Sequence, residues 1–239
     1  MPVRWASAGW KVLDFFLPPQ CGGCDRWGVS WCDSCQAKTE IIPSRICAVC
    51  GEPRFNRKGT DDGICDRCRS HQPEYTMVRS WARFSGPVRR AVYRLNYRRD
   101  AGLGKALSSY LVQIARDQHW VVNAVTVVPL DDERMRQRGY NQANLLAGPV
   151  AKALGVPFRP NALERVRKTQ SQVGLSRRER GENVRNAFSV SPDIMLGQQV
   201  ILVDDVITTG ATLRECARAL KKAGTKRVYG LTLARSLLE

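Results

Sequence analysis

Histidine and long apolar runs are both scarce in this chain. The two histidines, His71 and His119, are isolated, and neither lies in a pattern that predicts a catalytic base. No uncharged apolar stretch approaches the ~20 residues that span a membrane. Within the first 17 residues, Arg4, Lys11 and Asp14 interrupt the apolar positions, which is unlike the core of a signal peptide. We therefore expect a cytoplasmic protein with no membrane span.

Acidic residues are few relative to basic ones. The chain holds 38 Lys and Arg against 22 Asp and Glu, a net charge of +16. Residues 1–73 carry 10 basic and 8 acidic side chains (+2), and residues 74–239 carry 28 and 14 (+14). Such a surplus favours polyanions such as nucleic acid, pyrophosphate or nucleotides, although a solubilising surface is the alternative. Together with the cysteine pattern described below, this difference in net charge between the two segments predicts two domains, 1–73 and 74–239.

Eight of the nine cysteines lie in the first domain. In the cytoplasm, this concentration indicates metal binding rather than disulfides. They form four C-x-x-C knuckles, a spacing that lets two thiolates reach one zinc ion. Seven residues separate the first two knuckles and fourteen the second two. The knuckles are Cys21/Cys24, Cys32/Cys35, Cys47/Cys50 and Cys65/Cys68.

Sequential pairing of these knuckles predicts two four-sulfur zinc sites. Each half then closes locally at a lower entropic cost, while a crossed pairing remains the alternative. Four-sulfur sites are normally structural, and the metal would supply folding energy to a segment poor in large apolar residues. Redox thiols and an iron–sulfur cluster are the rival interpretations. Residues 4–17 are typical of an amphipathic helix that packs on this module or lies on a membrane surface. Cys216 is interpreted as a small buried residue.

The second domain alternates strands with helices. This order predicts an α/β fold with a parallel sheet flanked by helices. We expect strands at Tyr75–Phe84, Ala124–Leu130, Gln199–Val206 and Lys226–Ala234. We expect helices at Val88–Tyr97 and Ala101–His119, a third helix that ends at about Leu154, and a fourth after the loop at 208–212.

The segment from Val200 to Thr212 carries the most specific motif. Four apolar residues predict a buried strand, and Asp204 and Asp205 stand where it ends. A loop and a helix follow, so the polar groups lie where open α/β sheets bind ligands. The loop has hydroxyls, a glycine for close backbone approach and a helix start for an anion. Its residues are Thr208, Thr209, Gly210, Ala211 and Thr212.

This segment resembles the 5-phosphoribosyl-1-pyrophosphate loop of type I phosphoribosyltransferases. The resemblance implies that Asp204 and Asp205 hold the ribose 2- and 3-hydroxyls and that the threonine–glycine loop holds the 5-phosphate, with Mg²⁺ accompanying the ligand. Departure of pyrophosphate needs cations opposite that phosphate. Arg134 and Arg138, after the strand at 124–130, are the candidates. Arg138 has the alternative role of pinning the following helix, with Asn141 as a cap.

Nearly the whole chain resembles the ComF/GntX family, which joins a double zinc ribbon to a phosphoribosyltransferase-like domain. The resemblance rests on the four knuckles, Val-Pro-Leu at 128–130, Arg-Gly-Tyr-Asn-Gln at 138–142, the stretch from Gln172 to Phe188, and the Asp-Asp loop. It implies a role in natural competence or DNA utilisation, with single-stranded DNA and DNA-uptake helicase or processing proteins as partners. The family often has a lysine in the segment that reads Leu95-Asn96-Tyr97 here, and Asn96 does not supply that charge.

Three functions therefore stay open: a phosphoribosyltransferase with an unknown acceptor, a DNA-handling module, and a non-catalytic metabolite sensor. For DNA, we expect phosphate contacts from arginines and stacking on Trp81, Tyr93 and Tyr97. The expected arginines are Arg89, Arg90, Arg94, Arg98, Arg99, Arg177 and Arg178. The last two belong to the stretch 167–180, which is interpreted as a loop closing over the site or as a solvated surface loop.

Overall fold

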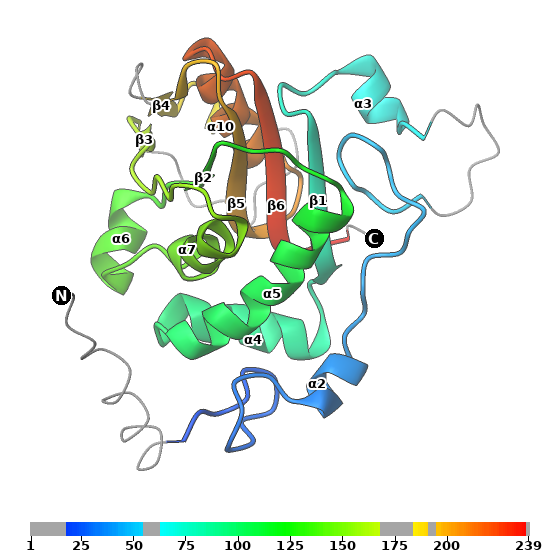
Figure 1. Ribbon diagram of the computed structural model, residues 1–239, viewed down its shortest axis with the longest axis vertical. Helices are drawn as coiled ribbons and strands as arrows, with labels where there is room; N and C mark the ends of the chain where they lie inside the picture. The colour runs from blue at the N-terminus through cyan, green and yellow to red at the C-terminus, as the bar shows by residue number, and fades with distance from the viewer. Residues whose placement is uncertain (1–17, 55–62, 168–183, 191–194, 238–239) are drawn as a thin grey trace.

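The computed structural model describes residues 18–54, 63–167, 184–190 and 195–237. The expected helix at 4–17 and the expected DNA contacts Arg177 and Arg178 lie outside these ranges. The centre of the fold is a four-stranded, wholly parallel sheet in the order β1-β6-β5-β2 (Figure 1). Its strands are β1 (Met77–Arg83), β2 (Ala124–Val127), β5 (Gln199–Ile207) and β6 (Arg227–Arg235).

The central strands form because their side chains are mostly apolar on both faces of the sheet. Val200–Val203 of β5 are all buried, and eight of the nine residues of β6 are buried. Continuous apolar runs are typical of parallel strands that are covered on both faces. The register pairs Val203 with Val127 on one side and with Leu231 on the other. All four strands therefore end at one edge of the sheet.

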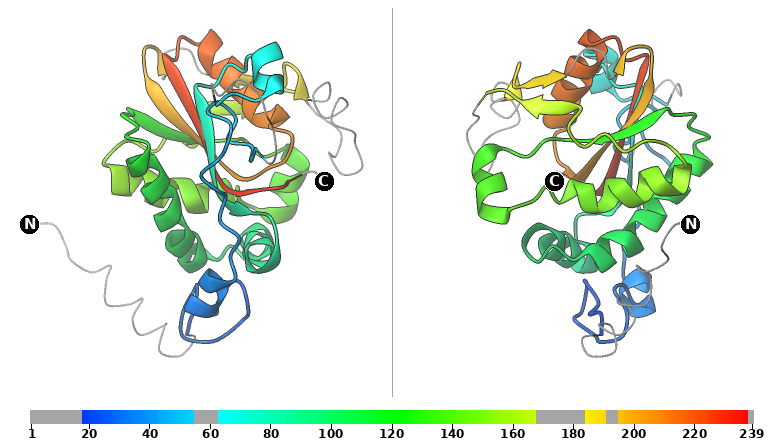
Figure 2. Two further views of the ribbon diagram at one scale, coloured as in Figure 1. Left: turned by 90° about the vertical axis from the view of Figure 1, so that its right-hand side faces the viewer. Right: turned by 60° about the vertical axis from the view of Figure 1, so that its left-hand side comes forward.

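Helices cover both faces of the sheet (Figures 1 and 2). One face packs against α4 (Gly86–Tyr97), α5 (Ala101–Asp117) and α7 (Ala143–Leu154) through one buried apolar cluster. The other face packs against α10 (Ala211–Lys222) through a second cluster.

Three short elements complete this domain. Helix α6 (Asp132–Arg138) follows β2, and β3 (Leu163–Arg165) pairs antiparallel with β4 (Phe188–Val190). The β3–β4 pair packs beside α10.

The cysteine-rich segment does not gather into one body. Its first half, with α2 (Asp33–Ala37), lies beneath α4, and its second half, with α3 (Asp66–Ser70), lies beside the far end of β1 (Figure 1). The connection runs along β1, where the N–H of Ile42 donates to the carbonyl of Trp81 at 3.0 Å. Among the described residues, no helix is both long and apolar enough to cross a membrane.

The predicted α/β class, the parallel sheet and its main helices are confirmed, with ends within a few residues of those expected. The sequence patterns missed α6 and the β3–β4 pair. The prediction that Trp81 offers a stacking face to DNA was wrong. Trp81 is 5% exposed, and its ring stacks on that of Tyr110 with 4.2 Å between the ring centroids. Trp81 is covered because it belongs to the core beneath α4 and α5. Its ring face is therefore not available to a base.

Candidate functional site

A pocket opens at the carboxyl ends of β2 and β5. It has a volume of about 160 Å³ and is walled by the end of β5, the following loop, the first turn of α10 and the segment after β2. Gly210 has φ +77°, a left-handed conformation that favours glycine, and it forms the N-cap of α10. Thr208, Gly210, Ala211 and Thr212 line the pocket. Thr209 is buried instead, and its Oγ1 accepts the N–H of Ala211 at 3.3 Å.

The two carboxylates stand at the same edge and both line the pocket. Asp204 Oδ1 accepts the N–H of Asp205 at 2.9 Å, and Asp205 Oδ1 accepts the N–H of Val206 at 2.8 Å. These bonds fix each carboxylate against its own backbone. Burial and the neighbouring carboxylate of Asp205 raise the pKa of Asp204 well above its ordinary value, and Arg134 opposes the rise.

The opposite wall supplies cations. Arg134 and Arg165 both line the pocket, and both lie near Asp131: Arg134 Nε is 3.3 Å and Arg165 Nη1 is 3.7 Å from Asp131 Oδ2. The other oxygen of Asp131 caps α6 by accepting the N–H of Arg134 at 2.9 Å. Burial lowers the pKa of Arg165, and Asp131 opposes that shift. The pocket therefore has an acidic wall and a basic wall.

Arg138 does not line this pocket. Its Nη1 donates to Asn96 Oδ1 at 2.8 Å and to Gln142 Oε1 at 3.0 Å, and its guanidinium lies 5.1 Å from the centre of the Tyr97 ring. Asn96, which replaces the lysine expected from the family resemblance, thus accepts a hydrogen bond that a lysine could not accept. These contacts favour the pinning role of Arg138 over a role at the leaving group.

The expected DNA-contacting arginines within the described ranges differ in their surroundings. Arg89 and Arg90 are exposed on α4. Arg94 is nearly buried: it pairs with Asp25 at 2.9 Å and with Asp100 at 3.0 Å, so its charge is already neutralised.

The other two arginines follow α4 and are exposed. Arg98 lines a surface groove together with Trp27 and Lys105. The guanidinium of Arg99 lies 5.6 Å from the centre of the Tyr140 ring.

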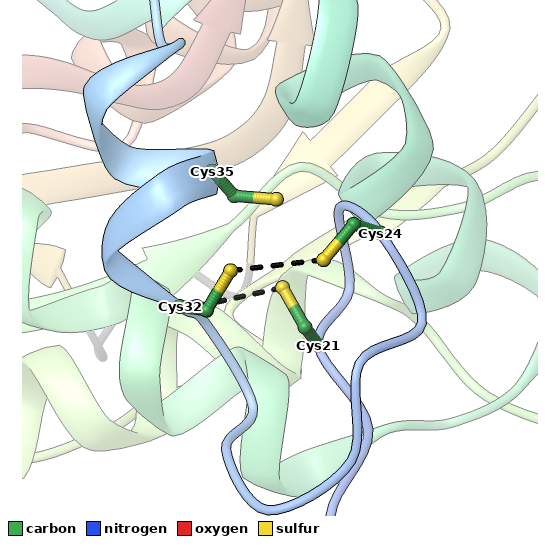
Figure 3. Close-up of side chains that lie close together, drawn as sticks. All are labelled: Cys21, Cys24, Cys32 and Cys35. Carbon is green, nitrogen blue, oxygen red and sulfur yellow. Dashed lines mark hydrogen bonds between the residues drawn. The ribbon is translucent and has the colours of Figure 1, made fainter.

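Eight cysteine sulfurs form two clusters in the sequential pairing. Within each cluster the ligand atoms lie within 4.8 Å of one another, which excludes the crossed pairing. Four sulfurs about 2.3 Å from a tetrahedral zinc would be about 3.8 Å apart. The Cys24 and Cys32 sulfurs are 3.6 Å apart (Figure 3). The Cys50 and Cys65 sulfurs are 3.7 Å apart. The first cluster is Cys21, Cys24, Cys32 and Cys35, and the second is Cys47, Cys50, Cys65 and Cys68.

The surroundings of the sulfurs also fit zinc thiolates. Cys21 Sγ accepts the N–H of Cys32 at 3.4 Å, and Cys47 Sγ accepts the N–H of Cys65 at 3.3 Å. Such bonds orient metal-bound sulfur and stabilise its negative charge. The donor set holds no water-exchangeable position, so zinc here serves the fold rather than catalysis.

Sequence reasoning missed three polar residues that line the pocket: Asp131, Gln142 and Arg165. Asp131 carried a readable signal, because an aspartate followed by the acidic residues Asp132 and Glu133 is typical of a helix N-terminus. Arg165 carried no such signal in the sequence. It lies in β3, which pairs with β4 more than twenty residues further along the chain, and a local pattern does not show that pairing.

Comparison with known proteins gives two domain families. Residues 12–71 match the double zinc ribbon domain, and residues 141–236 match the phosphoribosyl transferase domain. Competence protein F of Haemophilus influenzae is 32% identical over 213 residues, which cover 86% of this chain and 90% of that protein. DNA utilization protein YhgH of Salmonella typhi is 32% identical over 219 residues, covering 89% of this chain and 92% of its own length.

Competence protein ComFC of Bacillus subtilis is 30% identical over 213 residues, covering 86% of this chain and 84% of that protein. The order of the domains, the two cysteine clusters and the acidic pocket after β5 agree with these matches. The chain belongs to the ComF/GntX family of proteins that join a double zinc ribbon to a phosphoribosyltransferase domain.

Proposed function

We propose that the pocket after β5 binds 5-phosphoribosyl-1-pyrophosphate with Mg²⁺, and that the protein serves DNA uptake or utilisation in the cytoplasm. The observation that supports this ligand is that two carboxylates, the loop at the start of α10 and two arginines line one cavity. Carboxylates accept hydrogen bonds from sugar hydroxyls, and a helix start favours a phosphate. The names of the relatives support the biological role.

The charges in the pocket explain the proposed metal. Three carboxylates and two guanidiniums line the pocket: Asp204 and Asp205 on one wall, and Asp131 beside Arg134 and Arg165 on the other. A diphosphate would add negative charge that two arginines do not balance. Mg²⁺ binds through one or two carboxylates together with substrate phosphates. It would therefore supply positive charge to the carboxylates of the pocket and to the diphosphate.

Titration calorimetry tests this ligand. In the presence of Mg²⁺ we expect the wild-type protein to bind the diphosphate sugar, and Asp205→Asn to weaken binding about tenfold or more, as expected for a hydrogen bond that loses its charge. Asp117→Asn is the matched control, since Asp117 is exposed at the end of α5, away from the pocket. Absence of binding, or equal affinity of Asp205→Asn and wild type, would reject the proposal.

A second function is favoured by the exposed face of α4. We name this surface the α4 strip: Arg89, Arg90, Tyr93 and Tyr97. Tyr93 and Tyr97 are 66% and 59% exposed, and their ring centroids are 4.5 Å apart. Exposed aromatic rings beside arginines offer stacking faces and phosphate contacts to single-stranded nucleic acid. The α4 strip is therefore our proposed DNA surface, and Arg94 is left out of it.

Fluorescence anisotropy with a labelled single-stranded oligonucleotide tests the α4 strip. We expect the slope of log affinity against log salt to be about −0.7 for each phosphate neutralised. Tyr93→Ala should weaken binding about fivefold or more, as loss of base stacking does, whereas Tyr93→Phe should retain it. Binding that shows no salt dependence, or that is unaffected by Tyr93→Ala, would contradict this surface.

A further inference from the structure

The two cysteine clusters pack against different parts of the phosphoribosyltransferase domain. The first is pressed against α4 and α5: a Cβ at Gly22 would lie 2.5 Å from the Leu103 side chain, and one at Gly23 would lie 2.9 Å from Pro87 Cβ. Arg94 strengthens this contact by donating to the carbonyl of Cys21 at 3.3 Å. The first cluster therefore supports the helices that carry the α4 strip.

The second cluster is built into the edge of the sheet. The N–H of Val78 in β1 donates to the carbonyl of Val49 at 2.8 Å, and Arg235 at the end of β6 donates to the carbonyl of Cys50. The approach is close enough that a Cβ at Gly51 would lie 2.4 Å from the carbonyl oxygen of Val78. The knuckle of this cluster thus touches the strands on both sides of the β1–β6 pairing.

Tyr75 lies between this cluster and the loop 207–212. It is 5% exposed and shares a buried apolar cluster with Cys47, Cys50 and Cys68 and with Ile207 and Leu213, which flank the loop. Its hydroxyl lies 3.9 Å from the place that a Cβ at Gly210 would take.

The backbone beside Tyr75 is fixed as well. The N–H of Thr76 donates to the carbonyl of Val228 in β6 at 2.7 Å. This bond holds the backbone next to Tyr75 to the sheet, so the Tyr75 ring lies between the second cluster and Gly210 on an anchored segment.

We infer that Tyr75 is a positioning residue through which the second cysteine cluster, and not the first, holds the loop 207–212 in its binding conformation. Zinc in the second cluster would then be linked to the affinity of the pocket for phosphate, while zinc in the first would be linked to the α4 strip. The link to affinity rests on the ligand proposed above. The link to loop conformation does not.

Amide hydrogen exchange of the full-length protein tests the conformational link without any ligand. Cys65→Ser and Cys24→Ser form a matched pair, because each removes the most exposed sulfur of its cluster. We expect Cys65→Ser to speed exchange of the peptide covering residues 207–216 by about tenfold, since local opening of the loop becomes easier. Cys24→Ser should speed exchange near residues 20–35 and leave 207–216 unchanged.

Substitution of Tyr75 tests the residue itself. Tyr75→Ala should speed exchange of 207–216 and weaken binding of the diphosphate sugar, with zinc content equal to that of the wild type. Tyr75→Phe keeps the ring and loses only the hydroxyl beside Gly210, so its effects on exchange and on binding should be clearly smaller than those of Tyr75→Ala. Unchanged exchange around β2 and α7 would show that Tyr75→Ala remains folded.

The outcomes separate the two proposals. Equal effects of Cys65→Ser and Cys24→Ser on residues 207–216, or no effect of Tyr75→Ala there, would overturn the positioning role. If exchange responds as expected but wild-type protein does not bind the diphosphate sugar, the ligand is rejected and the positioning role stands.

Discussion

Asp204 and Asp205 are adjacent carboxylates, and holding two such negative charges together in the folded protein costs free energy. Each accepts a hydrogen bond from the next backbone N–H, which places both at the end of β5 instead of letting them separate into solvent. Burial and mutual repulsion disfavour a second negative charge, and they raise the pKa of Asp204. This arrangement suits a site that receives its compensating cation together with its ligand.

Asp204→Asn should therefore stabilise the protein while abolishing ligand binding. The folded pKa of Asp204 lies above its unfolded value, so its contribution to stability is favourable below the unfolded pKa and is lost as pH rises through the folded pKa. At pH 8 we expect the variant to melt about 2–4 °C higher, the shift that about 1 kcal/mol gives in a chain of this size.

Thermal unfolding of both proteins from pH 4 to pH 8 measures this effect. The difference in Tm should shrink as pH falls, because the wild-type carboxyl becomes protonated. A variant that is less stable than wild type at pH 8 would contradict the prediction.

At the scale of elements, one junction organises the pocket. Asn141 lies between α6 and α7, is 5% exposed, donates from Nδ2 to the carbonyl of Val128 at 2.9 Å and accepts the N–H of Ala143 at 3.0 Å. It thus ties the end of β2 to the start of α7. Arg138 adds a second tie by joining α6 to α4 through Asn96.

Asn141→Ala should destabilise the protein by about 1–3 kcal/mol, because it leaves a buried carbonyl and a buried N–H without partners. Urea unfolding measures the loss as a lower midpoint with an unchanged slope. Asn123→Ala is a useful comparison, since Asn123 also accepts a backbone N–H, from Gln199 at 2.8 Å, but at an exposed position. An equal loss in both variants would show that burial of Asn141 is not the cause.

At the scale of the whole molecule, two metal sites hold opposite sides of one sheet domain. The first cluster lies beneath α4 and α5, and the second lies beside β1 and β6. Segments 18–54 and 63–73 have few buried side chains other than cysteine. Zinc binding would therefore supply most of the energy that orders them.

We expect two zinc ions per chain by elemental analysis. Cys50→Ser should reduce the content to one, because it removes a buried ligand from one site. Cys216→Ala should leave two, because Cys216 is buried in α10 and belongs to neither cluster. Zinc content below two in Cys216→Ala, or above one in Cys50→Ser, would contradict the assignment.

Local patterns predicted much of this molecule. Apolar runs predicted the strands of the sheet, and the order of strand, Asp204-Asp205 and threonine–glycine loop predicted one wall of the pocket. C-x-x-C spacing predicted two cysteine clusters, and local loop closure favoured the sequential pairing that the structure shows, with the crossed pairing as the alternative. Each of these depends on residues close together in the chain. The opposite wall was harder, because Arg165 reaches the pocket only through the pairing of β3 with β4.

The sequence by itself determined the chemistry of the chain: thiolates at metal spacing, adjacent carboxylates at a strand end and a basic surplus. Only the tertiary structure decided which charges are available. Arg94 pairs with two carboxylates, Arg138 is held by Asn96 and Gln142, Trp81 is buried, and Tyr75 lies between a cysteine cluster and Gly210. The physical reason is that pairing, burial and close approach depend on residues distant in sequence, which a local pattern does not contain.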